Sequence, residues 1–149
     1  LFETFNDKML VVYLFVLKYN DFINCRKTYG TEEALTMLEA HLFTNICDCP
    51  GSTVTSLATA WLRSASATSQ TIRKLIQKGL VTRVNSKEDA KVFFLHPTNR
   101  GQLVSDMHKR YDVLDIIKTM KSLRHVLTEE EIDTMFKGLR AFGELLKRQ

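Results

Sequence analysis

The stretch TSLATAWLRSASATSQTIRKLIQKGLV, residues 55–81, decides the fold. It predicts a short helix over about 56–62 with Thr55 as its N-cap, because a threonine precedes a run of good helix formers. A second and longer helix is expected over about 65–77, with Ser64 as its cap. A short helix, a tight turn and a longer helix together predict a helix-turn-helix.

Directly after this stretch the pattern changes from helical spacing to alternation. Gly79 stands where a glycine ends a helix, and residues 80–84 then alternate in the manner of a strand. Residues 85–89 form a polar turn, and residues 91–95 give a second strand that Pro97 closes. The sequence therefore predicts a β-hairpin with a charged tip, which makes the fold a winged helix-turn-helix.

Longer helices are expected on both sides of this lobe. The N-terminal segment is apolar nearly all round, Thr31 is a plausible cap for a following helix, and Thr128 with the next three glutamates forms a capping box. A helix that is apolar on several sides must be covered, which indicates a subunit interface. We predict one mainly α (α+β) domain, with a winged-helix lobe at about 31–98 and dimerisation helices at about 5–27 and 99–147.

The composition is that of an ordinary globular protein. The chain has 149 residues, of which 44% are hydrophobic and 26% charged, so it can bury a core without metals or disulfides. Its three cysteines are an odd number and fit a reducing cytoplasm. The longest apolar run, Met9 to Leu17, is too short to cross a membrane, and no signal peptide is visible, although the chain begins without Met. Because no nucleotide-binding, metalloprotease or hydrolase motif is present, we expect no enzyme.

The positive charge is concentrated in one part of the chain. The formal net charge is +4, and residues 63–91 hold seven basic residues against two acidic ones. The whole positive excess lies there, which suits contact with a polyanion such as DNA. A solvated basic face is the alternative interpretation of the same charges.

The longer helix of the pair has the surface that a DNA reader needs. Thr68, Ile72 and Leu75 share its inner face at helical spacing, which leaves small and polar side chains outside. A major groove about 12 Å wide accepts one helix, and small outer side chains let its backbone approach the bases. A solvated helix face remains the alternative. The candidate DNA-binding residues are Ser64, Ser66, Ser69, Gln70, Arg73 and Lys74 on this helix, with Lys87 and Lys91 on the hairpin.

Several spaced motifs resemble one family. Leu57-Ala58, Lys78-Gly79-Leu80-Val81, Glu88-Asp89-Ala90-Lys91 and Thr98-Asn99-Arg100-Gly101 look like the MarR pattern, with matching spacing from Leu57 to Gly79. The resemblance implies a homodimer that binds double-stranded DNA and represses transcription until a small effector releases it. It also implies that Asp89 anchors the wing, although a simple turn-forming Asp is as good an interpretation.

The chain departs from that pattern at several positions. Lys91 stands where the family usually has the wing arginine, and it keeps the charge but loses the planar guanidinium. Ala65 and Ala90 replace residues that are frequently basic, and Trp61-Leu62 replaces the common leucine-glycine of the turn. These changes are expected to weaken binding or alter its sequence preference, without changing the fold.

A metal could be the signal that such a protein senses. His108 and Asp112 are four residues apart and share a helix face. By resemblance to the zinc-responsive branch of the family, His41 and His108 fall on histidine ligand positions and Asp112 replaces a third. That branch's glutamate ligand is unmatched, since Ile23 or Asn24 lies there. Solvated or capped histidines are the alternative, so we predict no cofactor and keep the three residues as candidates.

The cysteines offer a second means of sensing. Cys47 and Cys49 are one residue apart, and Cys25 lies near the end of the first helix. A thiol that responds to oxidation is one interpretation, and buried or inert thiols are the simpler one.

The predicted function is a sequence-specific DNA-binding transcriptional regulator. A zinc- or thiol-responsive regulator of the same fold is one alternative. A winged-helix module that binds only proteins is another, but it would lack the polar recognition face and the basic excess.

Overall fold

The computed structural model describes residues 2–89 and 92–146, and the chain divides into two compact units. The first unit is Leu1–Lys109 and the second is Arg110–Gln149. The lobe predicted at about 31–98 lies wholly within the first unit. Lys91 and Ala90, at the hairpin tip, lie outside the described residues.

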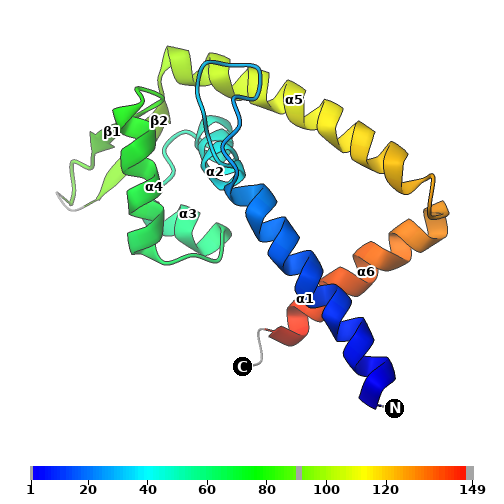
Figure 1. The fold of residues 1–149 in the computed structure, drawn as a ribbon. Helices are drawn as coiled ribbons and strands as arrows, with labels where there is room; N and C mark the ends of the chain where they lie inside the picture. The colour runs from blue at the N-terminus through cyan, green and yellow to red at the C-terminus, as the bar shows by residue number, and fades with distance from the viewer. Residues whose placement is uncertain (1, 90–91, 147–149) are drawn as a thin grey trace. The chain divides into compact units, whose positions relative to one another are not determined.

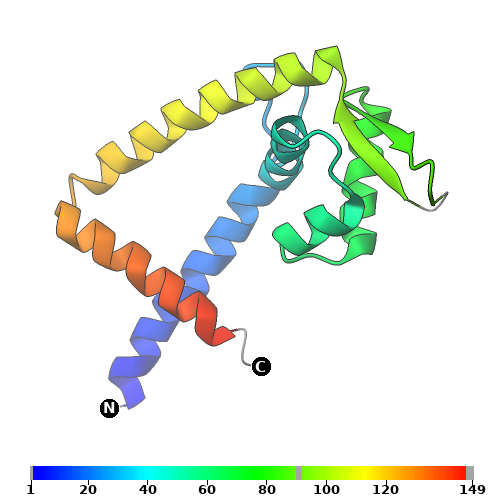
Figure 2. The same cartoon turned by 180° about the vertical axis from the view of Figure 1, so that it is seen from behind.

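The described residues form six helices and one two-stranded sheet, which confirms the predicted mainly α winged helix-turn-helix (Figures 1 and 2). No helix in the described part of the chain is long and apolar enough to span a membrane. The elements are α1 (Phe2–Asn24), α2 (Met37–Asp48), α3 (Val54–Ala60), α4 (Ala65–Gln77), β1 (Val81–Asn85), β2 (Phe93–Pro97), α5 (Asn99–Leu123) and α6 (Glu129–Leu146).

The start of α2 differs from the prediction. Its cap is Thr36, whose hydroxyl oxygen accepts from the Glu39 amide at 3.2 Å, while the Glu39 carboxylate accepts from the Thr36 amide at 3.0 Å. The Thr31 cap was wrong, because Thr31 uses its hydroxyl to donate to the Thr28 carbonyl at 2.7 Å. Residues 25–36 are instead a structured loop, in which Lys27 and Leu35 pair as an isolated β-bridge. The Thr-x-x-Glu capping box was legible in the sequence and was missed.

The cap of α3 also differs, whereas that of α4 is confirmed. Thr53 caps α3 and exchanges hydrogen bonds with Ser56, so the helix begins before the predicted Thr55 cap. Ser64 caps α4 as predicted, with its hydroxyl oxygen accepting from the Ala67 amide at 3.2 Å. Gly79 has a φ of +68°, the left-handed conformation expected directly after the end of α4.

The core of the first unit lies beneath the helix-turn-helix. α2 supplies its central side chains, and Leu80 and Leu95 from the two sides of the hairpin are fully buried with them. An isolated bridge between Ser52 and Leu95 ties the wing to the loop before α3. The side chains that α2, α3 and α4 contribute to this hydrophobic cluster are Ala40, Leu42, Phe43, Ile46, Cys47, Leu57, Ile72 and Leu75. The lobe therefore positions α4 and the wing as one packed body.

The wing is an antiparallel hairpin with an alternating pattern. Val81 pairs with Pro97 and Val84 with Phe94 in its register. Val84 and Phe94 are exposed while Leu95 is buried, so successive residues face opposite sides of the sheet.

Close packing at the start of α5 generates a test of the fold. A Cβ at Gly101 would overlap the carbonyl oxygen of Leu80 and lie 3.3 Å from the Phe43 ring. Gly101→Ala is therefore expected to lower the free energy of unfolding by ~2–3 kcal/mol, because backbone must shift. The measurement is urea unfolding followed by circular dichroism.

Gly138 in α6 provides the control, because a Cβ there meets nothing within 4 Å. Gly138→Ala should raise the stability by about 0.5–1 kcal/mol through helix propensity. Equal effects of the two substitutions would contradict the close packing of α5 against Leu80 and Phe43.

Candidate nucleic-acid interface and histidine pair

The outer face of α4 is polar and exposed, as predicted. Ser66, Gln70, Arg73 and Lys74 are exposed, and Ser69 is partly buried. The opposite face is confirmed as the buried one, with Thr68, Ile72 and Leu75 inside the lobe. Contact of the outer residues with DNA stays a prediction.

A buried carboxylate that the sequence analysis missed lies behind α4. Glu39, which is 5% exposed, accepts from both terminal nitrogens of Arg26 at 3.2 Å and lies 3.8 Å from the Lys74 ammonium. Arg26 also donates to the Ala34 carbonyl at 3.0 Å. Glu39 therefore joins the loop after α1, the start of α2 and the outer face of α4. The capping pattern at Thr36 was the one signal that could have revealed it.

A second carboxylate fixes the end of α4. Glu33 accepts from Lys78 at 3.0 Å and pairs with Arg100, which also donates to the Lys78 carbonyl at 2.6 Å. Hydrogen bonds from Arg100 and Lys78 hold the pKa of Glu33 below its ordinary value. These two cations serve the structure, so the basic excess overstates the charge that is available to DNA.

The described part of the wing has a compact turn. The Ser86 hydroxyl oxygen accepts from the amides of Glu88 and Asp89 at 3.1 and 3.3 Å, and Lys87 is exposed beside them. Asp89 is also exposed, and its role as a wing anchor stays a prediction. Arg83 is a basic residue that the sequence analysis did not assign; its guanidinium lies 5.4 Å from the Phe93 ring centroid.

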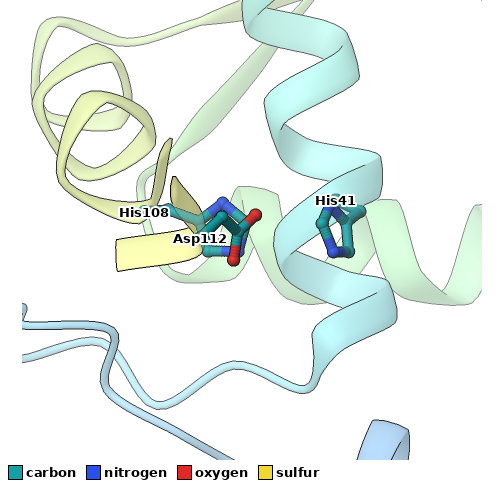
Figure 3. Close-up of side chains that lie close together, drawn as sticks. All are labelled: His41, His108 and Asp112. Carbon is teal, nitrogen blue, oxygen red and sulfur yellow. The ribbon is translucent and has the colours of Figure 1, made fainter. Parts of the chain in front are cut away.

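The structure brings the predicted histidines together inside the lobe. His41 comes from α2 and is partly buried, whereas His108 comes from α5 and is 1% exposed. Their ring centroids are 5.1 Å apart, and the Thr44 hydroxyl lies 3.3 Å from His108 Nδ1. Asp112 follows His108 by one turn of α5, and the ligand atoms of the three residues lie within 4.8 Å of one another (Figure 3).

This donor set fits a divalent cation such as zinc. Two imidazoles and a carboxylate are ordinary zinc ligands, each about 2.0–2.2 Å from the metal. Ligand atoms that lie within 4.8 Å of one another are close enough to bind one ion after small side-chain rotations. The fourth position of a tetrahedral ion is left to water or another group. These three residues form the donor set without a ligand at Ile23 or Asn24, where the zinc-responsive branch has its glutamate.

Two further rings flank the histidines, and the sequence analysis assigned neither. The Tyr29 ring meets His108 edge-on with centroids 4.6 Å apart, and the Trp61 ring stacks on His41 with centroids 6.1 Å apart. Tyr29 lies in the loop after α1, and Trp61 ends α3. The four rings thus run from that loop to the turn of the helix-turn-helix.

The thiols differ from one another in exposure. Cys47 is buried, which confirms that part of the prediction, and burial raises the pKa of its thiol. Cys25 and Cys49 are exposed, so packing does not explain them.

The lobe, the outward face of α4 and the hairpin define a winged helix-turn-helix protein. The model of the MarR family matches residues 35–93, which cover the helix-turn-helix and most of the wing. The match therefore lies within the winged-helix lobe, and the likeness to solved structures shows that the whole chain has the same fold as MarR-family regulators. No curated protein sequence matches the chain.

Solved structures carry the same fold along nearly the whole chain. FabT of Streptococcus pneumoniae, in complex with DNA, is 24% identical over 99% of both chains, with a TM-score of 0.67. MepR of S. aureus, also in a DNA complex, is 20% identical over 91% of this chain and 97% of its own, with a TM-score of 0.74. ZitR of Lactococcus lactis, a zinc-responsive MarR family member, is 17% identical over 95% and 99%, with a TM-score of 0.70.

Proposed function

We propose that this chain is a sequence-specific DNA-binding transcriptional regulator that reads the major groove with α4. The observation that carries the proposal is the outer face of α4, where Ser66, Gln70, Arg73 and Lys74 are exposed on a helix whose other face is fully packed. Small side chains on this face allow the helix to enter the major groove, and the polar side chains can form hydrogen bonds with the base edges. The FabT and MepR structures, which contain DNA, support this proposal.

The wing supplies the second part of the proposed interface. Lys87 is exposed at the hairpin turn, and Lys91 follows it in sequence with the same charge. Both lysines are proposed to contact phosphates or the adjacent minor groove. Ser64 and Ser69, on α4, are proposed to contact the DNA backbone. Phosphate contacts position the protein, and the α4 contacts specify the sequence.

We infer a homodimer from the long helices. One chain leaves the apolar side chains of α1 exposed, and such a surface on a monomer marks an interface. A two-fold dimer would also present two copies of α4 to a palindromic site. The exposed large apolar residues of α1 are Leu10, Val11, Tyr13, Leu14, Phe15, Val16, Leu17, Tyr19 and Phe22.

A zinc-responsive regulator is the second candidate. The observation that favours it over a repressor released by an organic effector is the approach of the His41, His108 and Asp112 ligand atoms to within 4.8 Å. When bound, the ion would cross-link α2 to α5. The likeness in fold to ZitR, described as zinc-responsive, also favours this candidate.

The proposed reader helix is tested by duplex selection from a random pool, followed by Arg73→Ala and Gln70→Ala. Each substitution is expected to cost roughly 1–3 kcal/mol of binding free energy on the selected duplex and to relax the base preference at one position.

Lys87→Ala should weaken binding to all duplexes by a similar factor and lower the slope of log K against log salt concentration by about one. Arg140→Ala, which removes the same charge from α6, is the control. A preference that survives both α4 substitutions would show that α4 is not the reader.

The dimer is tested by sedimentation equilibrium at micromolar concentration, where twice the mass of one chain is expected. Leu14→Asp places a charge on the exposed face of α1 and should shift the mass toward that of the monomer. Val84→Asp is the matched control, because Val84 is similarly exposed but lies on the wing. A wild-type monomer would refute this interface.

The metal site is tested by competition with a chromophoric chelator for zinc. His41→Ala and Asp112→Asn should each weaken zinc binding at least tenfold, because each removes one donor. His125→Ala removes an exposed histidine beyond α5 and should leave the affinity unchanged. If all four proteins bind zinc equally, the histidine pair is a packing feature of the lobe.

A further inference from the structure

Trp61 occupies a strained turn that sets the start of α4. It ends α3, where its amide donates to the Leu57 carbonyl at 3.0 Å. The next residue, Leu62, has a φ of +51° and a fully solvent-facing side chain, so no packing of its own holds this left-handed backbone. Two residues later Ser64 caps α4. Because Leu62 makes no packing contact of its own, Trp61 before it and the Ser64 cap after it hold the turn from which α4 begins.

The ring of Trp61 is the side chain that connects this turn to the histidine pair. It is partly buried against the core of the lobe and stacks on His41 with an interplanar angle of 27°. His41 in turn meets His108 at an angle of 84°, and His108 meets Tyr29. Tyr29 also has a left-handed backbone, with a φ of +49°. The ring series thus has a strained backbone at or beside both of its ends.

A cation bound by both histidines would fix the orientation of the His41 ring within the stack. The ligand atoms of His41, His108 and Asp112 lie within 4.8 Å of one another, and a shared zinc ion would hold each imidazole nitrogen about 2.0–2.1 Å from itself. His41 cannot rotate toward His108 without changing its overlap with Trp61, because the same imidazole makes both contacts. Packed interiors respond to such a shift by moving neighbours rather than by opening voids.

We propose that Trp61 transmits the metal occupancy of the His41–His108 pair to the helix-turn-helix turn and thereby changes the DNA affinity of α4. The inference rests on the proposed zinc response and names the residue through which it acts. Trp61 is a positioning residue: it touches neither the metal nor the DNA in this scheme. It passes the displacement of His41 to Leu62 and to the Ser64 cap.

The protein carries its own reporter for this step, because Trp61 is the single tryptophan of the sequence. Zinc, set by a chelator buffer, is titrated into the protein while tryptophan emission is recorded. The selected duplex is titrated in parallel at each zinc level. Zinc is expected to change the emission, and the change should have the same midpoint as a fivefold or larger change in the Kd for DNA.

Two substitutions separate coupling from binding. Trp61→Leu keeps an apolar side chain but removes the stacked ring, and Trp61→Phe restores a smaller ring. In the Leu variant, zinc affinity by chelator competition and DNA affinity without zinc should stay within threefold of wild type. The zinc-dependent change in Kd should fall below twofold there and recover in the Phe variant. Duplex binding without zinc also shows that each variant is folded.

The outcomes distinguish this inference from the functions on which it rests. Zinc that regulates the Leu variant as strongly as wild type overturns the role of Trp61 and leaves the metal site standing. Absence of zinc binding to the wild-type chain overturns the metal site and the coupling together, but not DNA binding. Regulation without any change in tryptophan emission also overturns the coupling through the stack.

Discussion

The buried carboxylate of Glu39 is the interaction on which the arrangement of the lobe depends. It accepts from the Thr36 amide, from both terminal nitrogens of Arg26 and, at longer range, faces Lys74. One charge therefore closes the start of α2, ties down the loop after α1 and lies beneath the recognition face of α4. A buried carboxylate is costly unless it is paired, so these partners stabilise one another. Removal of this carboxylate would leave Arg26 and the Thr36 amide without their acceptor. The loop after α1, the start of α2 and the Lys74 side chain of α4 would then be held less firmly.

Glu33 makes a similar set of ion pairs at the C-terminal end of α4. Its carboxylate pairs with Lys78 and Arg100, and Arg100 also donates to the carbonyl of Lys78, the residue that caps α4. The loop at residues 25–36 is thus joined to α2 through the Arg26–Glu39 pair and to the end of α4 through the Glu33–Lys78 pair, while Tyr29 packs on His108. A loop fixed in this way is part of the rigid support of α4. The cations that fix it are not free to bind phosphate, and this explains why a positive excess in sequence is a poor count of DNA contacts.

Local chemistry made much of this structure predictable from sequence. The Ser64 cap and Gly79 were correct because each depends on residues within four positions of one another, and the hairpin was correct because each strand alternates along its own five residues. The caps at Thr31 and Thr55 were wrong because several threonines competed, and the Thr36–Glu39 pair decided the first case through a reciprocal hydrogen bond. Glu39 with Arg26, and Trp61 with His41, were not predictable, since those contacts join residues 13 and 20 positions apart through tertiary packing. The histidine pair was found through resemblance, not through spacing.

The turn of the helix-turn-helix shows how a departure from a family pattern acquires a physical meaning. Trp61-Leu62 stands where leucine-glycine is common, and Leu62 has the left-handed φ of +51° that glycine adopts without cost. A leucine there costs about 1 kcal/mol or more, and its exposed side chain recovers none of that by packing. The adjacent Trp61 makes the compensating contact, a stack on His41 that a leucine could not form. The strained backbone and the ring contact are therefore adjacent in the turn, so a movement of His41 reaches the strained residue through a single side chain.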